Sequence, residues 1–384
     1  MIAYNSAAPL YLDYNATTPV APLVLEQMLP WFSQHFGNAS SSLHAYGWRA
    51  AEAVKIAREQ TAALIGAEPD EIYFCSGATE ALNLAIKGLF ELGGSQRKQI
   101  ISFKTEHKAV LDTLQYLQKK GADVIYLPLD ENGLPDIESI KATCNEHTLA
   151  IVAMLANNET GVIMPVNEYA EIASASGAVL ICDATQACGK IQVNLLHSGL
   201  ALLAMSAHKF YGPKGCGALY VRRKNPRIRI IPQLHGGGHE NGMRSGTLNV
   251  PGIVGMGAAA VLANTTFEKY TAVASERNSL EYHLQQLGAQ VNGQKASRLP
   301  NTLNFRFPGI DAARLIGLLP ELALATGSAC SSANSEPSHV LRAMGLSTDA
   351  CRESIRISLG KYASSEETQY ISTKFSDALQ KIQA

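Results

Sequence analysis

Between residues 70 and about 225, short runs of apolar and β-branched residues alternate with segments whose apolar positions recur at helical spacing. The short runs predict seven β-strands, over residues 71–75, 99–103, 123–127, 149–155, 178–183, 202–206 and 217–222. Amphipathic helices are predicted between them, for example over residues 80–92 and 108–120. This alternation is typical of βαβ units. It predicts an α/β fold with a mostly parallel seven-stranded sheet flanked by helices.

The pattern changes after residue 264. The elements predicted there are a long helix over 266–287, strands over 301–307 and 354–359, and a final helix from about Ser365. A chain of 384 residues is long enough for two or three domains. We therefore expect a large domain of residues 16–263, and a smaller α+β domain built from residues 1–15 and 264–384.

The composition narrows the function classes. Hydrophobic residues make up 46% of the chain and charged residues 17%, as in ordered globular proteins. The formal net charge is -1, so the basic surplus that nucleic-acid binding requires is missing. The one basic run, residues 222–229, is interpreted as a solvated strand end or hairpin rather than a docking patch.

Targeting and redox signals are also weak. No apolar run reaches the roughly 20 residues of a membrane span, and no basic segment precedes an apolar core at the N-terminus. The seven cysteines are an odd number without a C-x-x-C pair, which disfavours a zinc ribbon and a disulfide framework. We therefore expect a cytoplasmic protein that does not interact with membranes.

Two residues that can carry chemistry lie at the ends of predicted strands. Asp183 ends one strand, and Lys209 follows another. Ligands of such sheets bind beyond the carboxyl ends of the strands, so both residues can share one crevice. A lysine amine forms a Schiff base with an aldehyde, and a carboxylate keeps a pyridine nitrogen protonated so that the ring accepts electrons. The pair predicts an amino-acid enzyme that uses pyridoxal 5′-phosphate (PLP).

A phosphate site is predicted where the segment Ser76-Gly77-Ala78-Thr79-Glu80 follows a strand and opens a helix. Backbone N–H groups at a helix N-terminus, together with a hydroxyl, suit an anion, although any Ser/Thr N-cap gives the same pattern. Ser206 and His208 are close enough to Lys209 in sequence to contact the same phosphate. In isolation, His208 also fits an ordinary loop histidine.

Three further polar residues follow predicted strands. His107 stands between a strand and a helix, where its ring can stack on a pyridine or can simply be a partly buried residue at a helix start. Asn158 and Gln186 are candidate hydrogen-bond donors to a ring oxygen.

A histidine pair with i, i+4 spacing occurs at His235 and His239. Such a pair binds metal when it lies on a helix. Three intervening glycines disfavour a helix, so no metal site is predicted. The loop that follows, up to Thr247, is interpreted as approaching a phosphate or a neighbouring subunit.

Cys330 is surrounded by glycine and small polar residues over 326–335. That composition suits an exposed loop where a thiol of lowered pKa acts as a nucleophile, but composition alone leaves a packing role open. Cys182, inside an apolar strand, is by contrast a typical packing cysteine. Arg356 lies in an apolar run, where it either forms a structural ion pair or binds a substrate carboxylate with two hydrogen bonds.

Together and in this order, these motifs resemble those of the cysteine desulfurases that supply sulfur for iron–sulfur cluster assembly. This family is a branch of the fold-type I PLP-dependent transferases, related to the class V aminotransferases. The resemblance extends from Tyr11 to beyond Arg356. The matching segments are residues 11–19, 75–80, 105–108, 157–159, 183–186, 206–209, 235–239 and 327–330. Ala39 and Ser331 stand where relatives often carry proline and threonine.

The resemblance implies a role for each matching residue. Cofactor binding is implied for Ala78, Thr79, His107, Asn158, Asp183, Gln186, Ser206, His208, Lys209 and Thr247, the last from the second subunit of a homodimer. Substrate binding is implied for Asn15, Asn158 and Arg356. Catalysis is implied for Lys209 as cofactor anchor and proton shuttle, for His107, and for Cys330 as sulfur acceptor.

The implied reaction converts L-cysteine to L-alanine and leaves a persulfide on Cys330 for a sulfur-acceptor or scaffold protein. Three alternatives stay open at this point. A selenocysteine lyase uses the same leaving-group logic, and a class V aminotransferase needs no mobile thiol. A non-catalytic sulfur-assembly scaffold is the third alternative, but the presence of Lys209, Asp183, His107 and Cys330 argues against it.

Overall fold

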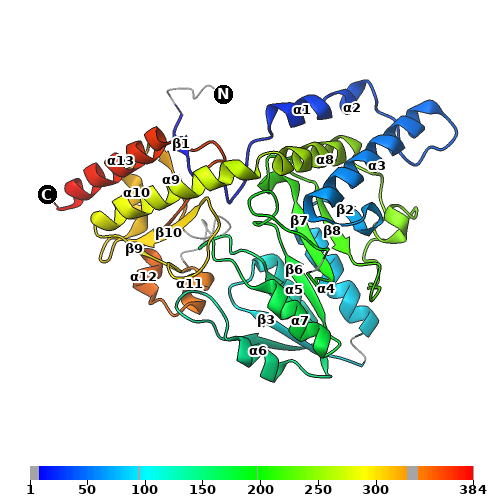
Figure 1. Ribbon diagram of the computed structural model, residues 1–384, viewed down its shortest axis with the longest axis horizontal. Helices are drawn as coiled ribbons and strands as arrows, with labels where there is room; N and C mark the ends of the chain where they lie inside the picture. The colour runs from blue at the N-terminus through cyan, green and yellow to red at the C-terminus, as the bar shows by residue number, and fades with distance from the viewer. Residues whose placement is uncertain (1–7, 94–95, 197, 327–335, 384) are drawn as a thin grey trace.

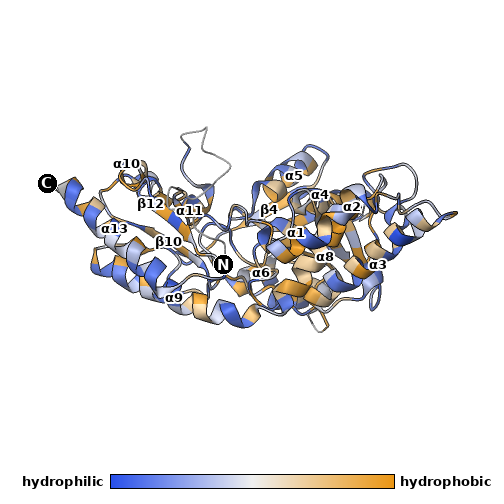
Figure 2. Cartoon of the chain, turned by 90° about the horizontal axis from the view of Figure 1, so that it is seen from above, coloured by the Kyte–Doolittle hydropathy of each residue, from blue (hydrophilic) through white to orange (hydrophobic). Residues whose placement is uncertain are grey.

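The computed structural model describes residues 8–93, 96–196, 198–326 and 336–383. A seven-stranded sheet with its helices and a smaller group of strands and helices lie side by side (Figure 1). Figure 2 shows the same arrangement from above, with α1, α3 and α8 at one end and α10 and α13 at the other.

The large sheet contains every strand that the alternating pattern predicted before residue 225, with each bound within one residue. Its strands are β2 (Ile72–Cys75), β3 (Gln99–Phe103), β4 (Asp123–Leu127), β5 (Thr148–Met154), β6 (Val179–Asp183), β7 (Leu202–Ser206) and β8 (Gly217–Val221). Their spatial order is β2-β8-β7-β6-β5-β3-β4. Only β8 runs antiparallel to its neighbours, so the mostly parallel sheet is confirmed.

Helices cover both faces of this sheet. One face packs against α4 (Ala78–Gly93) and α5 (Lys108–Gln118). The other packs against α1 (Pro22–Met28), α3 (Ala45–Ile65), α6 (Ile137–Thr143), α7 (Val166–Ala175) and α8 (Val250–Asn264). Because both faces are covered, all seven residues of β5 are buried. The short helix α2 (Pro30–Ser33) follows α1.

Helices α3 and α8 pack against each other closely. A Cβ at Gly257 of α8 would lie 2.6 Å from the Ala57 Cα of α3, so no larger residue fits there without moving the backbone. Small residues on both helices allow this approach. In Figure 2, α8 is mostly hydrophobic, whereas much of α9 and α13 is hydrophilic.

The smaller group has an antiparallel sheet of β12 (Ser354–Ser358), β10 (Thr302–Arg306) and β9 (Gln290–Val291). Its own core packs this sheet against α9 (Phe267–Gln286), α10 (Ala312–Gly317) and α13 (Ser365–Gln383). The N-terminal strand β1 (Leu10–Tyr11) joins it by pairing with β11 (Leu322–Ala323), and Leu12 is part of its core. The predicted strands and long helices after residue 264 are therefore present. The exact domain bounds stay a prediction.

The chain bends by 68° between α8 and α9. Two short helices, α11 (His339–Ala343) and α12 (Thr348–Arg352), complete the smaller group. In the described part of the chain, no single helix has both the length and the apolarity of a membrane span, and only the bent pair α8–α9 passes that test jointly.

Candidate active site

A cavity of about 480 Å³ lies at the carboxyl ends of β5, β6 and β7 and at the start of α4 and α5. Most of the predicted site residues line it: Asn15, Ala78, Thr79, His107, Asn158, Asp183, Gln186, Ser206, His208, Lys209 and Arg356. Thr247 is exposed and does not line the cavity of this chain. Cys330 lies outside the described residues.

Lys209 ends a short 3-10 turn (Ala207–Lys209) directly after β7. Its Nζ donates to the carbonyl oxygens of Asn15 at 2.6 Å and Ala16 at 2.8 Å. Both carbonyls belong to the segment that connects β1 to α1. The segment that follows the N-terminal strand thus binds the amine of a lysine that follows a strand of the large sheet.

Asp183 is the last residue of β6 and is buried. Its Oδ1 accepts a hydrogen bond from the Thr185 backbone N–H at 2.9 Å. The hydroxyl of Thr185 also lines the cavity, and this buried Oγ1 has no hydrogen-bond partner in the described part of the chain. A carboxylate and an unpaired hydroxyl therefore meet where the strand ends.

His107 is both the N-cap of α5 and part of the cavity wall. Its Nδ1 accepts from the Ala109 backbone N–H at 3.1 Å, so a neutral ring carries its proton on Nε2. Burial is the main cause that lowers the pKa of His107, although Asp183 acts in the opposite direction. The ring is therefore held in a fixed orientation, mainly uncharged at neutral pH.

The opposite end of the cavity suits an anion. Ala78 and Thr79 form the first turn of α4, where backbone N–H groups lack intrahelical acceptors. A Cβ on Gly77 would lie 3.7 Å from the buried Ser206 Oγ, so the strand hydroxyl stands beside the helix start. Burial, followed by the charge of Lys209, lowers the pKa of His208 to about 4. His208 contacts the Thr17 hydroxyl at 3.1 Å.

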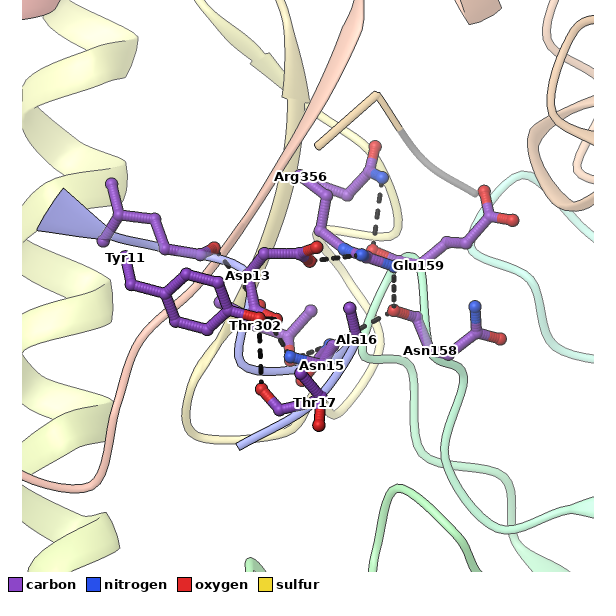
Figure 3. Close-up of polar contacts among 12 residues, drawn as sticks. Tyr11, Asp13, Asn15, Ala16, Thr17, Asn158, Glu159, Thr302 and Arg356 are labelled. Carbon is purple, nitrogen blue, oxygen red and sulfur yellow. Dashed lines mark hydrogen bonds and ion pairs between the residues drawn. The ribbon is translucent and has the colours of Figure 1, made fainter. Parts of the chain in front are cut away.

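Arg356 of β12 is 1% exposed and spans the gap between the two parts of the fold (Figure 3). Its Nη2 forms an ion pair with Asp13 Oδ1, and its Nη1 donates to the Asn158 carbonyl at 3.0 Å. Its Nε has no partner among the described residues. A guanidinium has five N–H donors, so this ion pair leaves donors for a carboxylate.

Four residues in or next to the site were not predicted from the sequence. Asp13 and Thr185 lie within matched motifs but were not singled out, Lys190 follows Gln186 by one helical turn, and His339 comes from the start of α11. His339 Nε2 contacts the Glu106 carbonyl oxygen at 3.0 Å and lines the cavity. The spacing of one helical turn after Gln186 could have drawn attention to Lys190. The position of His339 in the cavity wall follows only from the fold.

The segment from His235 to His239 is not helical. Gly236, Gly237 and Gly238 all have positive φ, and His239 Nδ1 accepts from the Gly246 backbone N–H at 3.2 Å. The expected loop conformation is therefore confirmed. Within the described ranges, no group of three or more His, Cys, Asp or Glu side chains forms a candidate metal site. Cys182 is buried, as expected of a packing cysteine.

Glu106 lies beneath the cavity and is buried, with Oε1 accepting from the Met154 backbone N–H at 2.8 Å. Oε2 has no partner in the described part of the chain. Burial raises the pKa of Glu106 well above its ordinary value, and Asp183 adds to this effect. The folded protein therefore binds an extra proton between the unfolded pKa, about 4.3, and the raised folded pKa, so stability falls as pH rises through that window.

We therefore expect Glu106→Gln to raise the melting temperature of the cofactor-free protein by about 2 °C or more at pH 8, and by less as pH falls toward 5. The matched control is Glu240→Gln, because Glu240 is a buried carboxylate paired with Arg58 at 2.6 Å. Its loss should lower the melting temperature. A pH-independent difference for Glu106→Gln would contradict the account of this carboxyl group.

Comparison with known proteins identifies the family of this chain. The sequence profile of the aminotransferase class-V family matches residues 10–371. The chain belongs to this family. Proteins named cysteine desulfurase IscS are similar over most of their length: one from Anaeromyxobacter sp. (strain Fw109-5) is 48% identical over 94% of this chain and 90% of its own. One from Neisseria meningitidis serogroup C / serotype 2a has the same identity and coverage.

Solved structures agree with the sequence relatives. A NifS-like protein superimposes with a TM-score of 0.90 at 37% identity, covering 97% of this chain and 99% of its own. A structure described as SspA in complex with cysteine has a TM-score of 0.80 at 34% identity, covering 92% and 99%. The predicted fold-type I architecture and the resemblance to cysteine desulfurases are therefore confirmed.

Membership in the family makes this chain a PLP-dependent enzyme, as predicted. The cavity fits that cofactor on its own evidence. A phosphate matches the start of α4 beside Ser206, and a protonated ring nitrogen matches the Asp183 carboxylate. The unpaired Thr185 hydroxyl offers a further donor. Lys209 lines the same cavity and would supply the amine that reacts with the cofactor's aldehyde.

Proposed function

We propose that this protein is a PLP-dependent cysteine desulfurase that converts L-cysteine to L-alanine and transfers the sulfur to Cys330. The atoms balance without another reagent. The substrate's carbon–sulfur bond breaks, a sulfur–sulfur bond forms at Cys330, and a hydrogen replaces sulfur on the substrate carbon. The observation that carries the proposal is one cavity lined by Lys209, Asp183 and Arg356.

Arg356 binds and orients the amino acid. Its guanidinium lies at the boundary between the two parts of the fold and is held by Asp13 and the Asn158 carbonyl. The unpaired Nε–H and the remaining Nη hydrogens are the donors that would bind the carboxylate of L-cysteine. Because the guanidinium is almost fully buried, water competes little for that carboxylate.

Lys209 moves the proton. When bound, PLP would supply an electron sink that acidifies the Cα proton and accepts the electron pair left on Cβ as the Cys330 thiolate takes the sulfur. Lys209 Nζ accepts the Cα proton, and the Asn15 and Ala16 carbonyls stabilise its protonated form. His107, held mainly neutral by burial, lines the cavity and would pack against the ring of the bound cofactor.

The finer parts of the proposal concern delivery. The small polar residues around Cys330 suit a nucleophilic thiol. Its persulfide would then pass the sulfur to an acceptor or scaffold protein for iron–sulfur cluster or other thiocofactor synthesis. We further propose a cytoplasmic homodimer in which Thr247 reaches the partner's phosphate site. Its exposure and its position outside this chain's cavity support that role.

The test is turnover of purified holoenzyme with L-cysteine, quantifying L-alanine. Formation of alanine over many turnovers supports the proposal, and a lack of alanine would contradict it. Parallel reactions with L-selenocysteine and with an amino acid plus a keto acid separate this activity from a selenocysteine lyase and an aminotransferase. A purely scaffolding protein would show no turnover in any reaction.

Arg356→Gln is expected to raise KM for L-cysteine roughly 100-fold, because the loss of a buried charged donor costs about 3 kcal/mol. The matched control is Arg306→Gln. Arg306 lies on the adjacent strand β10 and pairs with Glu353 at 2.8 Å. It does not line the cavity. Steady-state kinetics should show an unchanged KM for the control. Equal KM values for Arg356→Gln and wild type would assign Arg356 to the structural ion pair alone.

A further inference from the structure

A buried lysine, Lys190, lies close to the site that holds Lys209. Lys190 is 2% exposed, and its Nζ donates to Asn15 Oδ1 at 3.0 Å and to Gln186 Oε1 at 2.6 Å. It does not line the cavity, so it does not touch the substrate or the cofactor. A buried lysine amine with two side-chain amide partners needs an explanation beyond packing.

Asn15 is the centre of this network. Its carbonyl oxygen accepts from Lys209 Nζ at 2.6 Å and from Gln186 Nε2 at 2.9 Å. Its side-chain Nδ2 donates to the Asn158 carbonyl at 3.1 Å, which also accepts from Arg356 Nη1 (Figure 3). Asn15 therefore touches both the amine and, through one shared carbonyl, the carboxylate-binding guanidinium.

Lys190 contacts the acceptor ends of both amides and so helps to fix which way each one points. An amide side chain has a donor end and an acceptor end, and only its partners decide which end faces where. Lys190 donates to Asn15 Oδ1 at 3.0 Å, a shorter contact than the 3.3 Å from Asn301 Nδ2, and together they direct Asn15 Nδ2 toward the Asn158 carbonyl and the Thr302 hydroxyl. Lys190 also donates to Gln186, which directs Gln186 Nε2 toward the Asn15 carbonyl. Rotation of either amide would place a donor against a donor.

The protonation state fits this arrangement. Burial lowers the pKa of Lys190 well below its usual value, and the positive charges of Lys209 and Arg356 lower it further. A neutral amine keeps two N–H donors, which equals the number of acceptors that Lys190 meets among the described residues. Lys190 can therefore orient both amides without adding a third positive charge to the site.

We propose that Lys190 is a positioning residue that, through the amides of Asn15 and Gln186, fixes both the carbonyl that holds Lys209 and the carbonyl that holds Arg356. This inference rests on the proposed function for the identity of the substrate. It assigns to one buried amine outside the cavity a joint effect on proton transfer and on substrate binding.

The first test uses cofactor-free protein and measures the rate of PLP capture by absorbance as a function of pH. Capture requires the deprotonated Lys209 amine. In Lys190→Met, the Asn15 carbonyl is held less firmly and stabilises the Lys209 ammonium less. The pH midpoint should therefore shift down by about half a unit. The charge of Lys209 acts on the pKa of His107, His208 and Lys190, and Asp183, Lys214 and Arg356 line the same cavity.

An upward shift would overturn the proposal, because it would mean that Lys190 acts as a nearby positive charge. An unchanged midpoint would overturn it as well. This readout does not depend on turnover, so it remains valid if the protein fails to desulfurate cysteine. In that case the proposed function fails and the positioning role is still judged.

The second test is the kinetic split with L-cysteine. Lys190→Met should raise KM about tenfold and lower kcat, because both carbonyls lose their fixed positions. A merely structural role would lower only the apparent kcat, through the folded fraction. The matched control is Lys361→Met, since Lys361 is 4% exposed but does not line the active-site cavity. It should leave KM and the capture midpoint unchanged.

A double-mutant cycle completes the test. Lys190→Met and Gln186→Met should be strongly non-additive in KM and in the capture midpoint, because both disrupt one network. Additive effects would contradict action through Gln186. If Lys190→Met does not yield folded protein, Lys190→Gln retains an amide donor and should give intermediate shifts in the same directions.

Discussion

Lys209→Ala is expected to lower the rate of alanine formation from L-cysteine by about 10⁴-fold or more and to remove the visible absorbance of the covalently held cofactor. The variant loses both the amine that reacts with the aldehyde and the group that moves the Cα proton. The phosphate end of the cavity, at the start of α4 and Ser206, is untouched. Some PLP should therefore still bind without a covalent link.

The measurement combines absorbance of the reconstituted variant, its PLP content after denaturation, and alanine formation. Lys361→Ala serves as the control, because it removes a buried lysine that does not line the active-site cavity. The control should keep wild-type absorbance and turnover. Substantial turnover by Lys209→Ala would reject the assignment of this lysine.

Cys330→Ser is expected to keep the bound cofactor and its absorbance while reducing steady-state alanine and sulfide release at least about 10³-fold. A hydroxyl is a far weaker nucleophile toward sulfur than a thiolate, so sulfur is not removed from the substrate. Binding of L-cysteine should persist, because Arg356 is unchanged. The expected signature is therefore a spectral response to L-cysteine without multiple turnovers.

Ser331→Ala is the control, since it changes the residue beside Cys330 without removing a thiol. It should retain cofactor binding and turnover close to wild type. If Cys330→Ser desulfurates L-cysteine at the wild-type rate, the sulfur acceptor is another group. The six described cysteines are buried, which disfavours each of them as a replacement.

The sequence predicted the large sheet well because its strands are buried on both faces. After Thr148, β5 is apolar throughout, and the intervening helices α4 and α5 have one apolar face each. Helices α3 and α8 were not predicted, because their many small residues leave neither helix with one distinct apolar face. Their contact depends on close approach at Gly257, which periodicity does not report.

The site residues at strand ends could also be found from the sequence. Asp183 and Lys209 follow the rule that ligands bind at the carboxyl ends of parallel strands, and the structure brings both to one cavity. The pairing of Arg356 with Asp13 could not be found in this way, because the two residues are 343 positions apart. The sequence allowed an ion pair for Arg356 but named no partner.

Long-range hydrogen bonds explain the other omissions. Asn15 was assigned to substrate binding, yet within this chain its polar groups contact Lys190, Gln186, Lys209 and Asn158. Each partner lies more than 140 positions away. A single sequence carries no record of such contacts, so the role of Asn15 in joining the two halves of the site emerges only from the fold.

The central claim is that sulfur from L-cysteine passes to the thiol of Cys330. The most direct measurement is mass spectrometry of the holoenzyme after one brief exposure to a single equivalent of L-cysteine, with alanine quantified in the same sample. The account predicts one alanine per persulfide, with the added sulfur mass, about 32 Da, on the peptide that contains Cys330. Alanine formed without added mass on that peptide, or the added mass on another cysteine, would contradict it.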